Sequence, residues 1–180
     1  MSSTSPAPKR FYGKYQGTVV QNADPEFRGR VMCTVPDVLG LVPSSWCEAC
    51  TPLAGPTGPP MGTYIVPPIG TGVWVEFEHG DPNKPILTGC RLSPGGVPPL
   101  ALAGNPADPN ICIQSLLQHS IMISDMPPTP VTGGIILKST TNAMIVVNDS
   151  GIYISNGKGA MITMIGTAID FNTGAMTIVK

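Results

Sequence analysis

An eight-residue period runs through the last quarter of the chain and limits what that part can fold into. From residue 135 onward the sequence divides into units that begin at Ile135, Ala143, Gly151, Gly159, Thr167 and Ala175. Each unit continues with residues of strand character, and most units close on turn-forming residues such as Asn and Gly. Strands this short cannot bury a face alone, so the period predicts a stacked β-helix or prism.

The repeat carries much apolar surface and few charges. Its charged residues are Lys138, Asp149, Lys158, Asp170 and Lys180, against seven isoleucines after the first unit. A single stack of such strands would leave open edges and wettable faces, which is an aggregation hazard. Three copies wrapped about one axis would pair the edges and bury one face of each chain. The repeat therefore predicts a homotrimer, with residues 131–180 as a triple-stranded β-helix of three intertwined chains.

Strand alternation leaves two candidate faces for the interior of this needle. We favour positions three and five of each unit in the N-terminal units, because Lys138 at position four fits poorly in a narrow axis. In the later units, either face could line the axis. The candidate axis residues are Ile145, Val147, Tyr153, Met161, Ile169 and Phe171.

Five short segments rich in β-branched and aromatic residues precede the repeat. They span residues 12–21, 30–35, 45–51, 72–78 and 86–92, and turn residues lie between them. Five strands with one longer connection, over residues 52–70, favour a small Greek-key barrel such as the OB-fold. The fold class is therefore all-β, with a five-stranded barrel over residues 11–92 followed by the needle.

The remaining segments are rich in Pro, Gly and Ser. Residues 1–10 are expected to be a flexible arm, because Ser, Thr and Pro dominate them. Residues 93–130 are expected to form a linker and the base of the needle. Within them, the apolar stretch from Ile111 to Ser124 fits either a short helix or two short strands.

Charge and targeting signals exclude several classes of protein. Ten basic against eleven acidic residues give a net charge of -1, without the cationic surface that binding to nucleic acid needs. No apolar run approaches the length of a membrane-spanning helix, and the N-terminus lacks the apolar segment of a secretory signal. We expect a protein that is made in the cytoplasm and has no nucleic-acid partner.

The cysteines do not form a recognisable metal site. The five cysteines are an odd number and are dispersed through the chain, which does not favour a disulfide scaffold. Cys47 and Cys50 have the spacing of half a zinc site, but no second pair of ligands completes it. We therefore expect structural, reduced cysteines and no metal or other cofactor.

Catalytic patterns are equally weak. Glu76, Glu78 and Asp81 cluster around His79, but the sequence from Gly80 onward is typical of a hairpin turn rather than of an acid-base pair. No nucleophile elbow or phosphate-binding Gly-rich motif is present. The two tryptophans, Trp46 and Trp74, fit barrel packing better than a stacking platform. We expect no enzyme activity.

Two stretches carry a family resemblance. Residues 44–55 contain a Trp followed by a Pro and Gly turn, and residues 62–89 contain Pro-x-x-Gly-x-x-Val-x-Val-x-Phe, then Gly-Asp-Pro-x-x-Pro and a closing Gly. These motifs, in this order, resemble the OB-fold domain of phage baseplate spike and VgrG proteins. The repeat that follows is similar to the trimeric β-helical needle of the same family.

The resemblance implies a central spike that pierces a target membrane in a contractile phage tail or a related injection system. It implies a separate hub protein at the OB-fold end, since the sequence carries no hub region, and transient contact with the target membrane. No His lies between residues 120 and 180, so the iron-binding tip of some relatives is not expected. A PAAR-type tip protein would instead contact Thr177, Ile178, Val179 and Lys180. The spike would be assembled into the baseplate and delivered outward on contraction.

A binding module is the alternative. In that case the OB-fold would bind an oligosaccharide or oligonucleotide, and the repeat would be an oligomerisation stalk. Residues 1–92 carry seven basic and seven acidic side chains, which gives no sign of a cationic groove.

Overall fold

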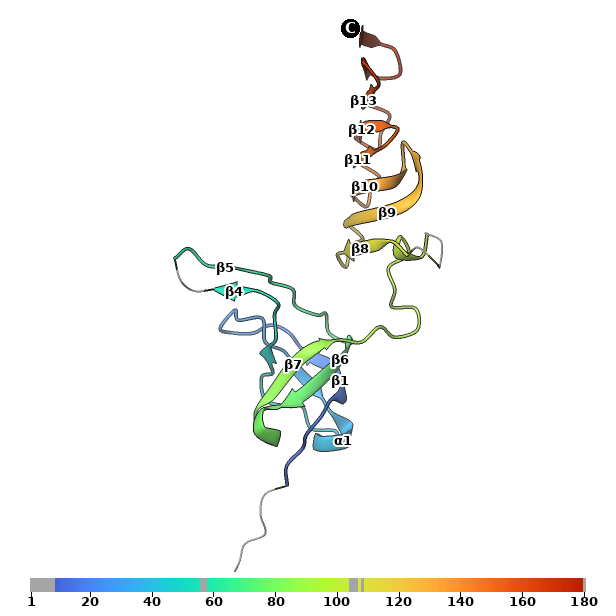
Figure 1. Ribbon diagram of the computed structural model, residues 1–180. Helices are drawn as coiled ribbons and strands as arrows, with labels where there is room; N and C mark the ends of the chain where they lie inside the picture. The colour runs from blue at the N-terminus through green and yellow to red at the C-terminus, as the bar shows by residue number, and fades with distance from the viewer. Residues whose placement is uncertain (1–8, 56–57, 104–106, 108, 180) are drawn as a thin grey trace, which may run out of the picture. The chain divides into compact units, whose positions relative to one another are not determined.

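The computed structural model describes residues 9–55, 58–103, 107 and 109–179. The chain divides into two compact units, residues 1–93 and residues 94–180. Both are built of short β-strands (Figure 1).

The first unit is a five-stranded barrel. Its strands are β1 (Tyr15–Gln21), β2 (Met32–Thr34), β3 (Glu48–Ala49), β6 (Gly72–Phe77) and β7 (Pro85–Cys90), in the sheet order β2-β1-β6-β7-β3. All neighbours are antiparallel except β3 and β7, which are parallel. Isolated bridges from Val31 to Cys47 and from Thr34 to Pro43 join the two end strands. This is the connectivity of a small Greek-key barrel, so the predicted OB-fold is confirmed.

Alternation along the strands fills the barrel. On β1, Gly17 and Val19 are buried while Gln16 and Thr18 are exposed. The core consists of small and β-branched side chains with one aromatic, namely Val19, Val31, Cys33, Val35, Cys47, Val73, Val75, Phe77 and Leu87. Gly17 is required there, because a Cβ at this position would lie 3.1 Å from both the Thr34 carbonyl oxygen and Val75 Cγ2. The barrel thus completes a core within one chain.

The connections of the barrel carry the remaining elements. A single-turn helix, α1 (Pro36–Leu39), follows β2, and a 3-10 turn, η1 (Glu78–Gly80), joins β6 to β7. The long connection predicted over residues 52–70 holds a small hairpin of β4 (Ala54–Gly55) and β5 (Met61–Gly62). Of the segment predicted as an arm, residues 1–8 lie outside the described residues. Arg10 is placed on the barrel, where it lies 3.9 Å from Asp81.

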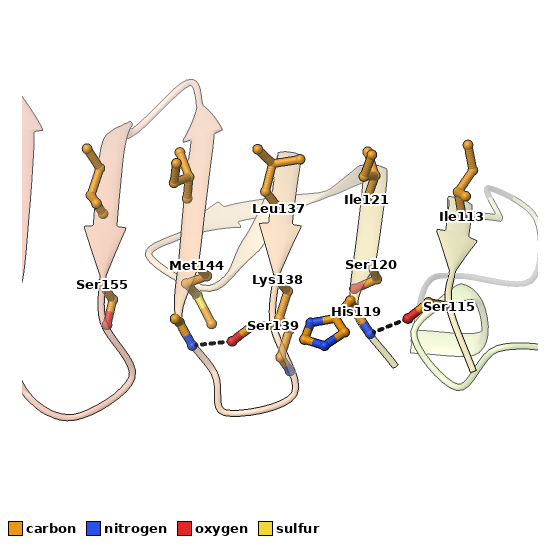
Figure 2. A pocket seen from close by; sticks show the side chains of 13 residues that line it. Ile113, Ser115, His119, Ser120, Ile121, Leu137, Lys138, Ser139, Met144 and Ser155 are labelled. Carbon is orange, nitrogen blue, oxygen red and sulfur yellow. Dashed lines mark hydrogen bonds between the residues drawn. The ribbon is translucent and has the colours of Figure 1, made fainter. Parts of the chain in front are cut away.

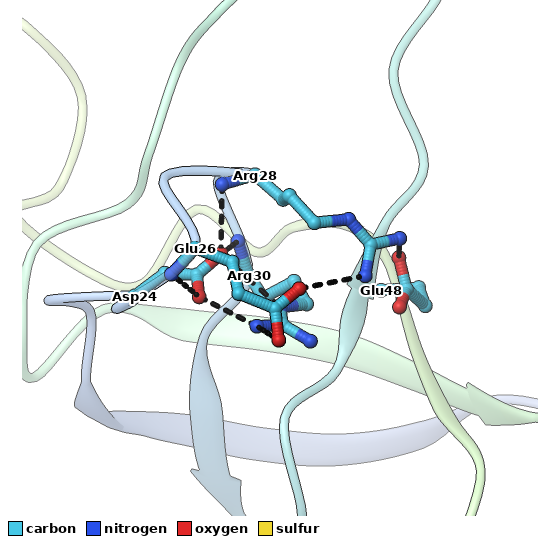
Figure 3. Close-up of polar contacts among 5 residues, drawn as sticks. All are labelled: Asp24, Glu26, Arg28, Arg30 and Glu48. Atoms are coloured by element: carbon cyan, nitrogen blue, oxygen red, sulfur yellow. Dashed lines mark hydrogen bonds and ion pairs between the residues drawn. The ribbon is translucent and has the colours of Figure 1, made fainter.

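A buried ion pair fixes the loop between β1 and β2 (Figure 3). Asp24 accepts two hydrogen bonds from the Arg30 guanidinium, at 2.8 and 3.1 Å, and further bonds from the backbone N–H groups of Glu26 and Arg28. Both Asp24 and Arg30 are buried. Because the bonds from Arg30 favour the charged carboxylate, the pKa of Asp24 lies well below its usual range. The barrel therefore satisfies its one buried charge pair internally.

The second unit is a single antiparallel sheet of eight strands. In chain order they are β8 (Ile111–Gln114), β9 (Ser120–Thr129), β10 (Thr132–Lys138), β11 (Met144–Asn148), β12 (Gly151–Ser155), β13 (Met161–Ile165), β14 (Ala168–Phe171) and β15 (Met176–Val179). A 3-10 turn, η2 (Ala101–Ala103), precedes them. Each strand pairs with the next one in sequence, so the unit is a ladder with one strand per rung (Figure 1).

The corners of this ladder follow the predicted turn residues. Asn142, Gly157, Gly166 and Gly174 all adopt positive φ, between 57° and 101°, at four of the hairpins. The stretch from Ile111 to Ser124 forms two strands and not a helix, and β9 continues to Thr129. The ladder therefore begins at Ile111 and not at residue 131, because the alternation of the repeat is already present in β8 and β9.

One face of the ladder has a small core near its first strands. Met122, Ile136, Val146 and Tyr153 are buried there, and Leu100 packs against them. Ser120 and Ser124 are buried on the same strand as Met122. The other face has no such cover among the described residues.

Candidate functional site

Two apolar rows run the length of one face of the eight-stranded sheet. Cross-strand pairing places each row residue directly opposite the next, from β8 to β15. The first row is Ile113, Ile121, Leu137, Ile145, Ile154, Ile162, Phe171 and Met176. The second row is Ile111, Ile123, Ile135, Val147, Ile152, Met164, Ile169 and Ile178. We call these two rows the apolar face; every one of its positions is hydrophobic.

The apolar face is open to solvent in the isolated chain. Exposed fractions range from 66% at Ile111 to 36% at Ile169, and only Ile162 and Phe171 are less exposed. Monomeric proteins rarely expose a contiguous apolar patch of this extent. Cross-strand contacts within the sheet cover only the flanks of these side chains, so a second surface is needed to cover their tips.

The predicted axis residues are split between the two faces. Ile145, Val147, Ile169 and Phe171 belong to the apolar face. Tyr153 and Met161 lie on the opposite face, where Tyr153 is buried and its hydroxyl lies 2.9 Å from Ser150 Oγ. The structure thus places four of the six residues on one face.

The register of the hairpins explains the split. A strict period of eight would keep odd-numbered residues on one face throughout. The β11–β12 hairpin instead places Ile145 opposite Ile154, so the apolar face passes to even-numbered residues. It returns to odd numbers where Ile162 pairs with Phe171. The sequence signal for this change was the pair Ile152 and Ile154 on either side of Tyr153. A fixed period of eight assigns Tyr153 to the apolar face and therefore ignores that signal.

Sequence reasoning also missed the start of the apolar face. Ile111 and Ile113 on β8, and Ile121 and Ile123 on β9, precede the eight-residue units and extend both rows. Their spacing of two residues was the available signal.

Lys138 lies where the sequence analysis placed it, away from the apolar face. Its neighbours across the sheet are Ser120 on β9 and Met144 on β11. Figure 2 shows Ile113, Ile121 and Leu137 in a row, with His119, Lys138 and Ser139 at the hairpin ends of the strands. These residues line an open hollow of about 610 Å³. The apolar face is therefore bordered by polar groups along its side.

The proposed tip-contact residues are on the last strand. β15 is the end strand of the sheet and pairs only with β14 among the described residues. Ile178 lies on the apolar face, whereas the hydroxyl of Thr177 donates to Asp170 Oδ2 at 3.3 Å on the other face. Val179 is 65% exposed, and Lys180 lies outside the described residues. The outer edge of β15 has no strand beside it in the described chain.

The acidic cluster of the barrel is a turn, as predicted. His79 adopts φ 51° within η1, and the Asp81 carboxylate accepts a bond from the backbone N–H of Asn83 at 3.0 Å. That bond is the main reason the pKa of Asp81 lies below its usual value. Glu76 pairs with Lys14 and Glu78 with Lys84. Each carboxylate therefore has a structural partner.

The two tryptophans and two of the cysteines contribute to the packing of the barrel. Trp46 and Trp74 are half-buried, and the Arg30 guanidinium lies 5.8 Å from the ring centre of Trp46. All five cysteines are free; Cys33 and Cys47 are in the core, and Cys50 is exposed. Contact with Cys47 and burial raise the pKa of the Cys33 thiol.

Within the described residues, no group of three or more His, Cys, Asp or Glu side chains is arranged to hold a metal ion.

Comparison with protein families assigns both units. Residues 15–91 match the type VI secretion system and phage-baseplate injector OB domain, and residues 110–177 match the phage baseplate V C-terminal trimerisation domain. A search of curated proteins found no match. None of the helices in the described part of the chain is long and apolar enough to cross a membrane.

The second match covers the ladder from the residue before β8 to the first two residues of β15. The unit that carries the apolar face is therefore a domain whose family forms homo-oligomers, and both domains are structural parts of baseplates. The chain belongs to the phage baseplate V family of VgrG-like baseplate spike proteins.

Proposed function

We propose that three copies of this chain form the central spike of a contractile phage tail or related injection system, and that the spike pierces the target membrane. The observation that carries this proposal is the apolar face, an uninterrupted double row over eight strands in a domain of a trimerisation family. Such a face needs a partner of the same length, and a copy of the chain supplies one.

In the proposed trimer the apolar faces of the three chains meet at the axis. Ile145, Val147, Ile169 and Phe171 line it as the sequence analysis expected. Ile152 and Ile154 take the place of Tyr153, and Ile162 and Met164 take the place of Met161. At roughly 1 kcal/mol for each half-exposed side chain that becomes buried, the two rows would contribute on the order of 15 kcal/mol per chain before association costs.

The proposed mechanism is mechanical. Sheath contraction drives the tube forward, and the narrow spike concentrates the force on a small area of membrane. The backbone hydrogen bonds of the ladder run strand to strand along its whole length. Bending or fraying a trimer therefore requires breaking these bonds together with the apolar axis, which resists local opening.

Partners are proposed at both ends of the spike. A baseplate hub protein would bind the OB-fold end. A PAAR-type tip protein would add its backbone to the open edge of β15 and contact Thr177, Ile178 and Val179, since an unpaired strand edge favours such addition. Lys180 remains part of the proposed contact. The spike would be made in the cytoplasm, assembled into the particle and delivered outward on contraction.

The first test is the absolute mass of the full chain by light scattering, with and without mild heating in detergent. We expect a species of three chains that resists dissociation. A monomer would overturn the proposed spike.

The second test uses particles. Particles produced with the wild-type chain should permeabilise target cells on contraction, and particles whose spike carries Ile178→Asp should lose a bound tip protein. Particles that lack this chain yet still assemble, contract and permeabilise target membranes would overturn the proposed piercing role.

A further inference from the structure

Among the residues that the structure describes, the charged side chains of the second unit have no ionic partner. Every ion pair among the described residues joins side chains between positions 10 and 84, in the barrel. In the ladder, Lys138, Lys158, Asp125 and Asp149 make no side-chain hydrogen bond or ion pair within the described chain. Asp170 is the exception, because its carboxylate accepts a bond from the backbone N–H of Gly174 at 2.7 Å.

These unpaired charges are sorted by sign on the two sides of the ladder. Alternate hairpins turn on opposite sides, because consecutive strands run in opposite directions. The hairpins that join β8 to β9, β10 to β11, β12 to β13 and β14 to β15 lie on one side, with Lys138 at the end of β10 and Lys158 in the turn after β12. Asp170, whose carboxylate is already hydrogen-bonded within its own hairpin, lies beside the last of these turns. We call this side the basic margin.

The other side of the ladder carries the opposite sign. The hairpins that join β9 to β10 and β11 to β12 lie there, with Asp125 beyond the Ser124–Gly134 pair and Asp149 in the turn after β11. We call this side the acidic margin. No positive side chain is placed on it among the described residues.

Each margin is hollowed where its charges lie. His119 and Lys138 line the hollow of about 610 Å³ on the basic margin (Figure 2). Asp125 and Asp149 line a hollow of about 540 Å³ on the acidic margin, beside Asn148. Both margins therefore hold charged groups that remain available to a partner.

We propose that the basic margin of one chain docks against the acidic margin of a second copy, and that these contacts repeat around the trimer. The inference rests on the proposed trimer. Three ladders with their apolar faces inward form a prism, and at each corner a margin of one chain meets a margin of the next. In a ring of identical chains each contact joins two different surfaces, so the two margins must be complementary.

The heights of the charges along the ladder fit such a contact. Copies related by rotation about the long axis present the same strand at the same height. Lys138 ends β10, Asp125 lies on β9, one strand away, and Asp149 lies just beyond β11. With about 4.8 Å between strands, the flexible lysine side chain can reach either carboxylate of its neighbour. Lys158, after β12, lies at a similar offset from Asp149.

This arrangement gives the charges a role that the apolar face cannot fill. Apolar rows are alike from rung to rung, so two chains could pack in opposite directions at small cost. Turning one chain end for end, with its apolar face still inward, exchanges its two margins, so like charges would then face each other. The margins therefore set the parallel direction of the chains.

Charge reversal tests the proposal in the full chain. Lys138→Glu with Lys158→Glu, or Asp125→Lys with Asp149→Lys, should speed trimer dissociation in detergent by roughly 3- to 100-fold, since each lost pair occurs three times per trimer. All four changes together should restore a rate near wild type. The matched control Lys84→Glu, which removes a barrel charge paired with Glu78, should leave the rate unchanged.

Cross-linking tests the geometry independently of stability. In a background with the native cysteines replaced by serine, Lys138→Cys with Asp149→Cys should give covalent dimers and trimers on oxidation. The control pair Lys138→Cys with Lys158→Cys, which places both thiols on the basic margin, should give none.

The outcomes separate this inference from the proposed function. A monomeric wild-type chain would overturn both. A stable wild-type trimer whose dissociation ignores all four charge reversals, or one in which only the same-margin cysteines cross-link, would overturn the margin contact and leave the trimer standing.

Discussion

The barrel and the ladder of this protein are both built from short β-strands, but they complete their interactions differently. The barrel joins its end strands through the Val31–Cys47 bridge, buries a core of its own, and pairs Asp24 with Arg30 inside one chain. The ladder has two open end strands, an exposed apolar face and unpaired charges. A closed sheet pairs its own edge strands and covers its own apolar side chains. A single open sheet leaves its edges and one apolar face exposed, so other copies of the chain must cover them.

The largest expected effect comes from separating the two units. A chain cut after Ser93 should remain folded and have the mass of one chain, while residues 94–180 alone should form trimers. Light scattering of each fragment measures the mass, and the full chain is the control. A trimeric barrel fragment would show that the ladder is not what assembles the protein, and would break the comparison.

A charge on the apolar face should have the next largest effect. Ile145→Asp places three carboxylates near the proposed axis, where an unpaired buried charge costs each chain about 3–5 kcal/mol. We expect monomers by light scattering, with the barrel still folded by its thermal transition. Thr173→Asp, in the exposed turn after β14, is the matched control and should remain trimeric. A stable Ile145→Asp trimer would mean that this face does not line the axis.

Removing the buried carboxylate should weaken the barrel without changing assembly. In Asp24→Asn the guanidinium of Arg30 loses its buried anionic partner and keeps only the exposed Glu26, 3.0 Å away, so the thermal unfolding midpoint of the barrel should fall. The trimer mass should be unchanged. Arg28→Ala, which removes an exposed pair with Glu48, should lower the midpoint much less.

The difference in thermal unfolding midpoint between wild type and Asp24→Asn should depend on pH with a definite sign. The pKa of Asp24 is depressed in the folded state, so its stabilisation is fully present above the unfolded value of about 3.9 and is lost as the pH falls toward the folded value. The midpoints of wild type and Asp24→Asn should therefore differ most near neutral pH and converge below about pH 4. A difference that stays constant from pH 7 to pH 3 would contradict the assignment.

How much could be predicted from the sequence also differs between the two regions. In the barrel, Pro and Gly mark every turn, so strand positions and the OB-fold followed from local chemistry and a resemblance. In the ladder, the corners at Asn142 and Gly157 were predictable for the same reason. The set of residues that forms the apolar face was not predictable. It depends on whether Ile145 pairs with a residue an odd or an even number of positions away in the sequence, and the register of the hairpin decides that.

The sorting of charges by margin was beyond the sequence for a related physical reason. Lys138 and Asp149 are eleven residues apart, and nothing local indicates that they lie on opposite sides of a sheet. Their separation follows only once the direction of each strand is known. The side on which a residue lies in a meander depends on how many hairpins precede it. One misplaced turn in the prediction therefore moves every later residue to the wrong side.

The smallest expected effect concerns an exposed ion pair that the barrel completes by itself. Lys14 lies 3.0 Å from Glu76, and both side chains are well exposed. Exposed pairs of this kind contribute little, so Lys14→Ala should change the free energy of unfolding of the barrel by no more than about 0.5 kcal/mol. Chemical denaturation of residues 1–93 measures it. Lys138 has the same charge but no ionic partner among the described residues of its chain. We therefore expect Lys138→Ala to change the free energy of trimer dissociation by more than Lys14→Ala changes the free energy of barrel unfolding. Equal, negligible effects would mean that the ladder's charges are also merely solvated.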